Sequence, residues 1–229
     1  LHGWPILPEN MISTRPGPML AAADRFDITV TGLGGHAAMP HGARDPIVAA
    51  AALVQAIQSI VSRNVDPVQG AVISVTMFNA GSAFNIIPET CTMSGTVRAL
   101  HEEAMTTVRA RLEQVVQEIA SAYGCKASLD YHVGYPVTRN DEAEVETVLD
   151  TARSVLEEDQ VQLLEAPGMG AEDFSYYCEQ VPSCFFVVGL LPPDRDSMPM
   201  LHHPCFDFND DVIATGIEMF CKLALNNQG

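Results

Sequence analysis

The chain has 229 residues, of which 47% are hydrophobic, and a formal net charge of −17. This composition allows a sizeable core in one or two domains and argues against a disordered chain. The negative charge leaves no basic surface for nucleic acid or an anionic membrane, so neither is expected as a partner.

Six cysteines are scattered along the chain without a C-x-x-C pair. They lack the spacing of a small disulfide scaffold and favour reduced thiols in a reducing compartment such as the cytoplasm. No run of about 18 uninterrupted apolar residues occurs, so the sequence predicts no membrane span. The chain starts at Leu1 rather than at a methionine, and we expect it to be a piece of a longer polypeptide.

Residues 1–22 are rich in proline and glycine, and residues 1–5 resemble the end of a strand running into a loop. His2 would then lie at a strand terminus, where a ligand can face a cleft. The alternative is an ordinary exposed histidine near a chain end.

A regular alternation of elements follows. Alternating Phe26, Ile28 and Val30 predict a strand, and apolar residues near a period of 3.6 predict two long helices. The predicted order is strand, helix, strand, strand, helix, strand, over residues 26–31, 46–62, 71–78, 90–100, 102–123 and 127–133. This βαββαβ order indicates a ferredoxin-like domain, an antiparallel sheet with two helices on one face, at residues 24–134.

The connection after the first of these strands reads Gly-Gly-His-Ala-Ala-Met-Pro-His at residues 34–41. The glycines permit a sharp turn, so His36 leaves the strand end without a bulky neighbour. Asp45 is the predicted N-cap of the next helix, with Pro46 in its first turn. His36 is therefore either a hydrogen-bond donor to a ligand or a turn histidine before that helix.

The last part of the chain alternates helices and short strands, predicted over residues 140–158, 161–164, 171–179, 185–188 and 210–225. Two strands with little partner sequence cannot form an independent α/β core. We therefore interpret residues 1–23 and 135–229 as parts of one incomplete α/β domain.

Several polar residues stand in loops or at element ends. Asn85 lies among apolar residues and either fixes its loop or contacts a ligand. Arg98 ends a strand, where a guanidinium can clamp a carboxylate, although most arginines are surface charges. Glu172 is either a charge at a helix start or an acidic active-site group. His202 and His203 are adjacent, so at most one of them is expected to join His2 as a metal ligand.

These polar residues belong to short motifs that follow one another along the chain. In order, the motifs are His2-Gly-Trp-Pro, Gly34-Gly-His-Ala-Ala-x-Pro-His41, Asp45-Pro-Ile, Asn85-Ile-Ile-Pro88, Gly95-Thr-Val-Arg98, Gly170-Ala-Glu-Asp-Phe174 and Leu201-His-x-Pro204. The ordered set resembles the metal-dependent amidohydrolases that include hippurate hydrolase, N-acyl-amino-acid amidohydrolase and plant auxin-conjugate hydrolases. These belong to the wider aminoacylase and carboxypeptidase G peptidase family.

The resemblance implies an α/β metallopeptidase catalytic domain with two divalent ions, zinc, manganese or cobalt, interrupted by a ferredoxin-like lid that also forms a homodimer. It implies that His2 and His202 are metal ligands and that His36 reaches the active site of the partner subunit. Asn85 and Arg98 would hold the carbonyl and the carboxylate of a small N-acyl amino acid. Glu172 would lie near the site.

The family's other metal ligands and its catalytic glutamate precede the lid, and nothing like them precedes His2. We therefore expect residues 1–23 to be a segment of the catalytic domain, residues 24–134 the lid, and residues 135–229 the C-terminal part of the catalytic domain. The chain by itself is expected to be inactive. The alternative is a non-catalytic dimerisation or ligand-binding module.

Overall fold

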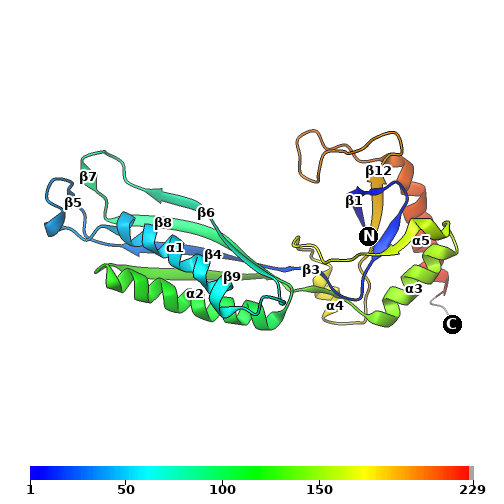
Figure 1. Ribbon diagram of the computed structural model, residues 1–229, viewed down its shortest axis with the longest axis horizontal. Helices are drawn as coiled ribbons and strands as arrows, with labels where there is room; N and C mark the ends of the chain where they lie inside the picture. The colour runs from blue at the N-terminus through cyan, green and yellow to red at the C-terminus, as the bar shows by residue number, and fades with distance from the viewer. Residues whose placement is uncertain (227–229) are drawn as a thin grey trace. The chain divides into compact units, whose positions relative to one another are not determined.

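The computed structural model describes residues 1–226, and the chain divides into two compact units (Figure 1). The inserted unit comprises Ala21–Val137 together with Met169–Ala171. The flanking unit comprises Leu1–Leu20, Thr138–Gly168 and the residues from Glu172 onward. The boundaries expected from the sequence, at residues 24 and 134, lie a few residues inside the main stretch of the inserted unit.

The inserted unit is built on a four-stranded antiparallel sheet in the order β6-β8-β4-β9. Figure 1 shows two helices along one face of this sheet. The predicted βαββαβ order is confirmed, with β4 (Ala22–Thr31), α1 (Pro46–Asn64), β6 (Ala71–Ala80), β8 (Thr90–Ala99), α2 (Glu102–Ala122) and β9 (Lys126–Tyr135).

The core of this unit lies between the sheet and the two helices. Because side chains alternate along a strand, one set of sheet residues enters the core, and it meets the apolar stripes of α1 and α2. Buried members include Phe26, Ile28, Val30, Leu53, Ile57, Met93, Val97, Val108 and Leu112. The apolar residues that recur with a period of two in the strands and of 3.6 in the helices are therefore the ones that face the core.

The first turn of α1 forms as predicted. The Asp45 carboxylate accepts a hydrogen bond from the Ile47 N–H at 2.8 Å, and Pro46 occupies the first turn. By length and composition alone, α1 is apolar enough to cross a membrane. Its buried residues pack into the same core as the sheet, which is the position of a core helix.

A buried carboxylate closes the end of the sheet where the chain enters and leaves the unit. Asp24 accepts hydrogen bonds from Tyr131 Oη at 2.7 Å, Gly134 N–H at 2.9 Å and Arg109 Nη2 at 3.1 Å. Burial raises the pKa of Tyr131, so its hydroxyl stays protonated and donates at neutral pH. The Arg109 guanidinium also lies 4.9 Å from the centroid of the Tyr131 ring. One carboxylate thus joins β4, β9 and α2.

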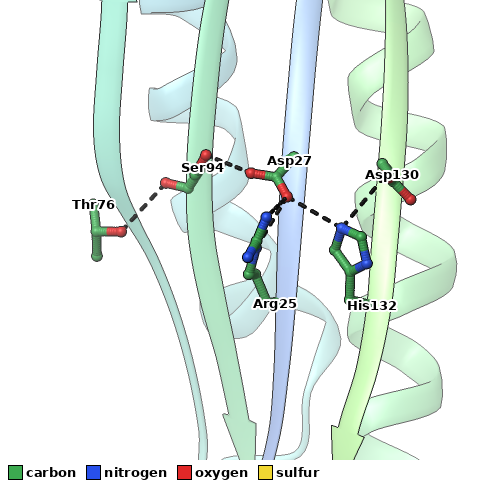
Figure 2. Close-up of polar contacts among 6 residues, drawn as sticks. All are labelled: Arg25, Asp27, Thr76, Ser94, Asp130 and His132. Atoms are coloured by element: carbon green, nitrogen blue, oxygen red, sulfur yellow. Dashed lines mark hydrogen bonds and ion pairs between the residues drawn. The ribbon is translucent and has the colours of Figure 1, made fainter.

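The other face of the sheet carries a cluster of polar side chains (Figure 2). At its centre the Asp27 carboxylate accepts hydrogen bonds from Ser94 Oγ at 2.5 Å, from Arg25 Nη2 at 2.6 Å and from His132 Nε2 at 3.1 Å. These partners come from β8, β4 and β9, so the cluster joins three neighbouring strands.

The Asp27 cluster makes the stability of the inserted unit depend on pH. Hydrogen bonds from Ser94 and Arg25 hold the pKa of Asp27 below its ordinary value. The stabilisation is therefore present above about pH 4, where an unfolded aspartate is ionised, and is lost as the pH falls through the lower folded pKa. We expect Asp27→Asn to destabilise the unit at pH 7, and the difference from the unaltered protein to shrink as the pH falls through the lowered pKa of folded Asp27. Urea unfolding at stepped pH tests this, and a difference that persists unchanged in acid contradicts it.

The flanking unit contains a mixed sheet in the order β1-β12-β2-β11, a separate β3–β10 pair, and the helices α3 and α5, which contact each other. Its elements are β1 (His2–Pro8), β2 (Ile12–Thr14), β3 (Gly17–Leu20), β10 (Thr138–Asn140), α3 (Glu142–Arg153), β11 (Val161–Leu163), α4 (Ser175–Cys178), β12 (Val187–Leu191) and α5 (Ile213–Asn226). Short 3-10 helices lie at η2 (Glu158–Gln160) and η3 (Asp210–Val212). All six cysteines of the chain are free.

Three details of this unit differ from the sequence prediction. The proline-rich head forms three strands rather than mostly loop. The strand expected at residues 185–188 begins only at Val187, because the Asn140 side chain bonds both the N–H and the carbonyl of Phe185. The helix expected over residues 171–179 shortens to α4, because the Glu172 carbonyl accepts from both the Ser175 N–H and Ser175 Oγ in a preceding turn.

Candidate active site

His36 and Asn85 come together on a short two-stranded ribbon beyond one end of the sheet (Figure 1). In this ribbon β5 (Gly35–His36) pairs antiparallel with β7 (Ile86–Ile87), just before the 3-10 helix η1 (Pro40–Gly42). The Ala37 N–H donates to the Asn85 carbonyl at 3.1 Å. The ribbon therefore joins two loops that are about 50 residues apart in the sequence.

A pocket of about 550 Å³ lies at this ribbon. Its lining residues include the polar residues His36, Asn85 and Glu89 and the apolar residues Ile86, Ile87 and Pro88. Of these residues, His36 and Asn85 are site residues predicted from the sequence, whereas Ile86 and Glu89 are not. The only feature of the sequence that could have pointed to Ile86 and Glu89 is that they lie close to Asn85 in the chain.

Hydrogen bonding decides which ring nitrogen of His36 carries the proton. Nδ1 lies 3.1 Å from the backbone nitrogen of Ala38. A backbone N–H only donates, so Nδ1 accepts and holds no proton. In the neutral ring the proton is therefore on Nε2. His36 offers an N–H donor, which suits a carbonyl oxygen better than a metal ion.

Arg98 lies at the opposite end of the same sheet. β8 begins at Thr90 beside the ribbon, and Arg98 stands eight residues further along, roughly 26 Å at the usual rise of a strand. Arg98 is half-buried opposite Ala23, and its Nη1 donates to the Val97 carbonyl at 3.1 Å. Among residues 1–226 no carboxylate pairs with it, so its remaining donors are available to an acidic ligand.

His2 is the first residue of β1 and is exposed. Its Nδ1 lies 3.0 Å from the Gly3 carbonyl oxygen. A carbonyl only accepts, so Nδ1 carries the proton and Nε2 keeps its lone pair. This is the tautomer of a metal-ligating histidine, and it is the reverse of the tautomer at His36.

Glu172 and His202 belong to the same flanking unit as His2. Glu172 is half-buried in the turn before α4. His202 is exposed with φ of 67°, a conformation that is uncommon outside glycine. The neighbouring His203 accepts a hydrogen bond from the Cys205 N–H at 3.1 Å, whereas His202 has no hydrogen-bond partner among the described residues.

The imidazoles of His2 and His202 are of a type that binds divalent metal ions, but two imidazoles are not a complete ligand set. Within residues 1–226 no three His, Cys, Asp or Glu side chains lie close enough together to hold a metal. A metal site that used His2 or His202 would therefore need further ligands.

Residues 22–124 match the description of the peptidase dimerisation domain. The inserted unit is therefore similar to this domain family. The match begins with β4 and ends just before β9, so it covers most of the ferredoxin-like unit.

The whole chain, including the flanking unit, is similar to known hydrolases. It is 38% identical to N-acetyl-L-cysteine deacetylase from Bacillus subtilis over 93% of its own length and 49% of that protein. It is 36% identical to hippurate hydrolase from Campylobacter jejuni over 98% of its own length and 57% of that protein. The chain thus spans about half the length of the curated relatives it matches.

A solved structure shows the same arrangement of elements. The chain aligns over 99% of its length, and 55% of the other chain, with a dinuclear metal-binding peptidase of the M20 family from Bacillus subtilis. The TM-score is 0.77 and the sequence identity 28%. These matches confirm the predicted resemblance to amidohydrolases and metal-dependent peptidases.

Proposed function

We propose that the whole protein containing this chain hydrolyses the amide bond of small N-acyl amino acids with two divalent metal ions, zinc, manganese or cobalt, in a reducing compartment such as the cytoplasm. The observation that carries the proposal is that two histidines hold their ring protons on different nitrogens. His36 is fixed as an N–H donor, and His2 is fixed with a free Nε2 lone pair. The similarity to two deacylating enzymes supports the same reaction.

In this proposal each of the predicted site residues has a role. His36 donates through Nε2–H to the oxygen that gains charge as the amide carbonyl is attacked, with Asn85 beside it in the pocket. Arg98 holds the carboxylate of the amino acid. His2 and His202 would hold metal, with Glu172 near them. When bound, the metal ions polarise the carbonyl and lower the pKa of a bound water.

The separation of these groups requires two copies of the chain at each site. Roughly 26 Å of strand lies between the ribbon with His36 and the position of Arg98. A small N-acyl amino acid does not span this distance. His36 and Arg98 act on one substrate only if they come from different subunits, so the active site is shared within a homodimer.

The strand β6 is the edge that suits this dimer. It pairs only with β8 in the sheet order and carries the exposed apolar residues Val72, Met77 and Phe78. The opposite edge, β9, carries Lys126, Asp130 and His132, and charges on an edge strand discourage pairing with another strand. The uncharged edge with its apolar patch is therefore the interface.

We expect Phe78→Lys to weaken self-association at least about tenfold, because it places a charge in the β6 interface. Val133→Lys is the matched control: Val133 is 68% exposed on the β9 edge, and its replacement should leave the dimer intact. Sedimentation velocity of the two variants over a concentration series measures the effect. Equal weakening by both changes contradicts this interface.

The second candidate function is a non-catalytic dimerisation or ligand-binding module, which the match to a dimerisation domain favours. Metal analysis and a screen of N-acyl amino acids on the full-length protein separate the two. We expect bound divalent metal and hydrolysis that a chelator abolishes. Residues 1–229 alone should stay inactive, because the described residues 1–226 contain no complete ligand set. Intact dimers of the full-length protein without metal or hydrolysis would favour the module.

A further inference from the structure

Ile86 is the direct cross-strand neighbour of His36 in the β5–β7 ribbon. Directly opposite residues of an antiparallel pair project to the same face, with Cβ atoms about 5 Å apart. Ile86 also lines the pocket that His36 lines, and it is 53% exposed. Its neighbour Ile87 projects to the other face and is 8% exposed. Ile87 therefore packs inside the unit, whereas the side chain of Ile86 is not part of the core.

The position of Ile86 limits which part of a substrate it can touch. A carbonyl oxygen that accepts the His36 Nε2–H lies about 2.9 Å from that nitrogen, so the groups bonded to the carbonyl carbon fall within reach of Ile86. In an N-acyl amino acid these groups are the acyl chain and the amide nitrogen. The amide nitrogen leads to a carboxylate, which an exposed isoleucine cannot stabilise. The acyl chain is the apolar substituent and gains from burial against Ile86 and Pro88.

We propose that Ile86 is a specificity-determining residue that contacts the acyl group, and that the site prefers acyl chains larger than acetyl, such as an aromatic acyl group. The inference rests on the proposed amidohydrolase function. Glu89 lines the same pocket, so an acyl chain that ends in a second carboxylate is disfavoured by like charge.

The test compares two substrates that differ only in the acyl group, N-acetylglycine and N-benzoylglycine, with the full-length protein. Ile86→Ala should lower kcat/KM for the benzoyl substrate about tenfold and change that for the acetyl substrate less than about twofold. Ile86→Phe narrows the pocket, so it should also lower the ratio of kcat/KM for the benzoyl substrate to kcat/KM for the acetyl substrate. Val68→Ala is the matched control, because Val68 is 85% exposed in the turn before β6 and lines none of this pocket.

A second readout needs no turnover. The Ile86 methyl signals of isotope-labelled, metal-free protein should shift during titration with N-benzoylglycine and move less with N-acetylglycine. Equal losses of kcat/KM for both substrates in Ile86→Ala, or an unchanged ratio, overturn the assignment of Ile86 while the amidohydrolase function stands. Failure of the unaltered protein to hydrolyse either substrate refutes the proposed function, and the inference about Ile86 falls with it.

Discussion

Replacing His36 with alanine should lower the kcat of the full-length protein by about 10²–10³-fold, the usual cost of removing one donor to a developing oxyanion. The KM should change little, because the donor matters most once charge builds on the carbonyl oxygen. His41→Ala is the matched control, since His41 is an exposed histidine on the adjacent 3-10 helix η1. Steady-state kinetics on one N-acyl amino acid measures both. Turnover within twofold of the unaltered protein in His36→Ala would refute the role of His36.

A mixing experiment tests whether His36 and Arg98 serve one site from different subunits. Arg98→Ala is expected to be impaired as well, because it removes the group that holds the carboxylate. Mixed and allowed to exchange subunits, the two inactive variants form heterodimers in which one site has both His36 and Arg98. Random exchange should then restore roughly a quarter of normal turnover. A mixture no more active than its parts would show that both groups come from one chain.

The largest expected effect on stability is that of Asp24→Ala. The change removes a carboxylate whose side chain is 2% exposed and which accepts hydrogen bonds from Tyr131, Gly134 and Arg109. Taking the acceptor away from a buried hydrogen-bond donor costs about 1–3 kcal/mol for each donor. The inserted unit should therefore lose most of its margin of stability. Hydrogen exchange of the β4, β8 and β9 amides, measured over a urea series, reports this unit.

Two controls localise the effect of Asp24. Asp130→Ala removes an exposed carboxylate on the same sheet and should cost less than about 0.5 kcal/mol. Trp4 is the single tryptophan of the chain and lies in the flanking unit, so its fluorescence reports that unit alone. Exchange rates in the sheet that are the same for Asp24→Ala and Asp130→Ala would contradict the importance of the buried carboxylate.

The flanking unit shows where local patterns are insufficient. Phe185 and Phe186 belong to an apolar run that is typical of a buried strand, yet the strand starts at Val187. The cause is Asn140, a side chain 45 residues away that takes the backbone bonds of Phe185. A buried polar group must find partners, and the sequence around Asn140 does not reveal which backbone it will meet.

The sequence by itself determined the elements of the inserted unit, the N-cap of α1 and the faces that are buried, because these depend on spacings of a few residues. It also drew attention to His2, His36, Asn85 and Arg98. Only the tertiary structure showed where these residues lie and which groups they contact. The pairing of His36 with Ile86, the contrasting tautomers of His36 and His2, and the length of strand between His36 and Arg98 arise from the folded backbone and its hydrogen bonds. Contacts between residues far apart in the sequence leave no periodic signal, so no reading of one chain could have predicted them.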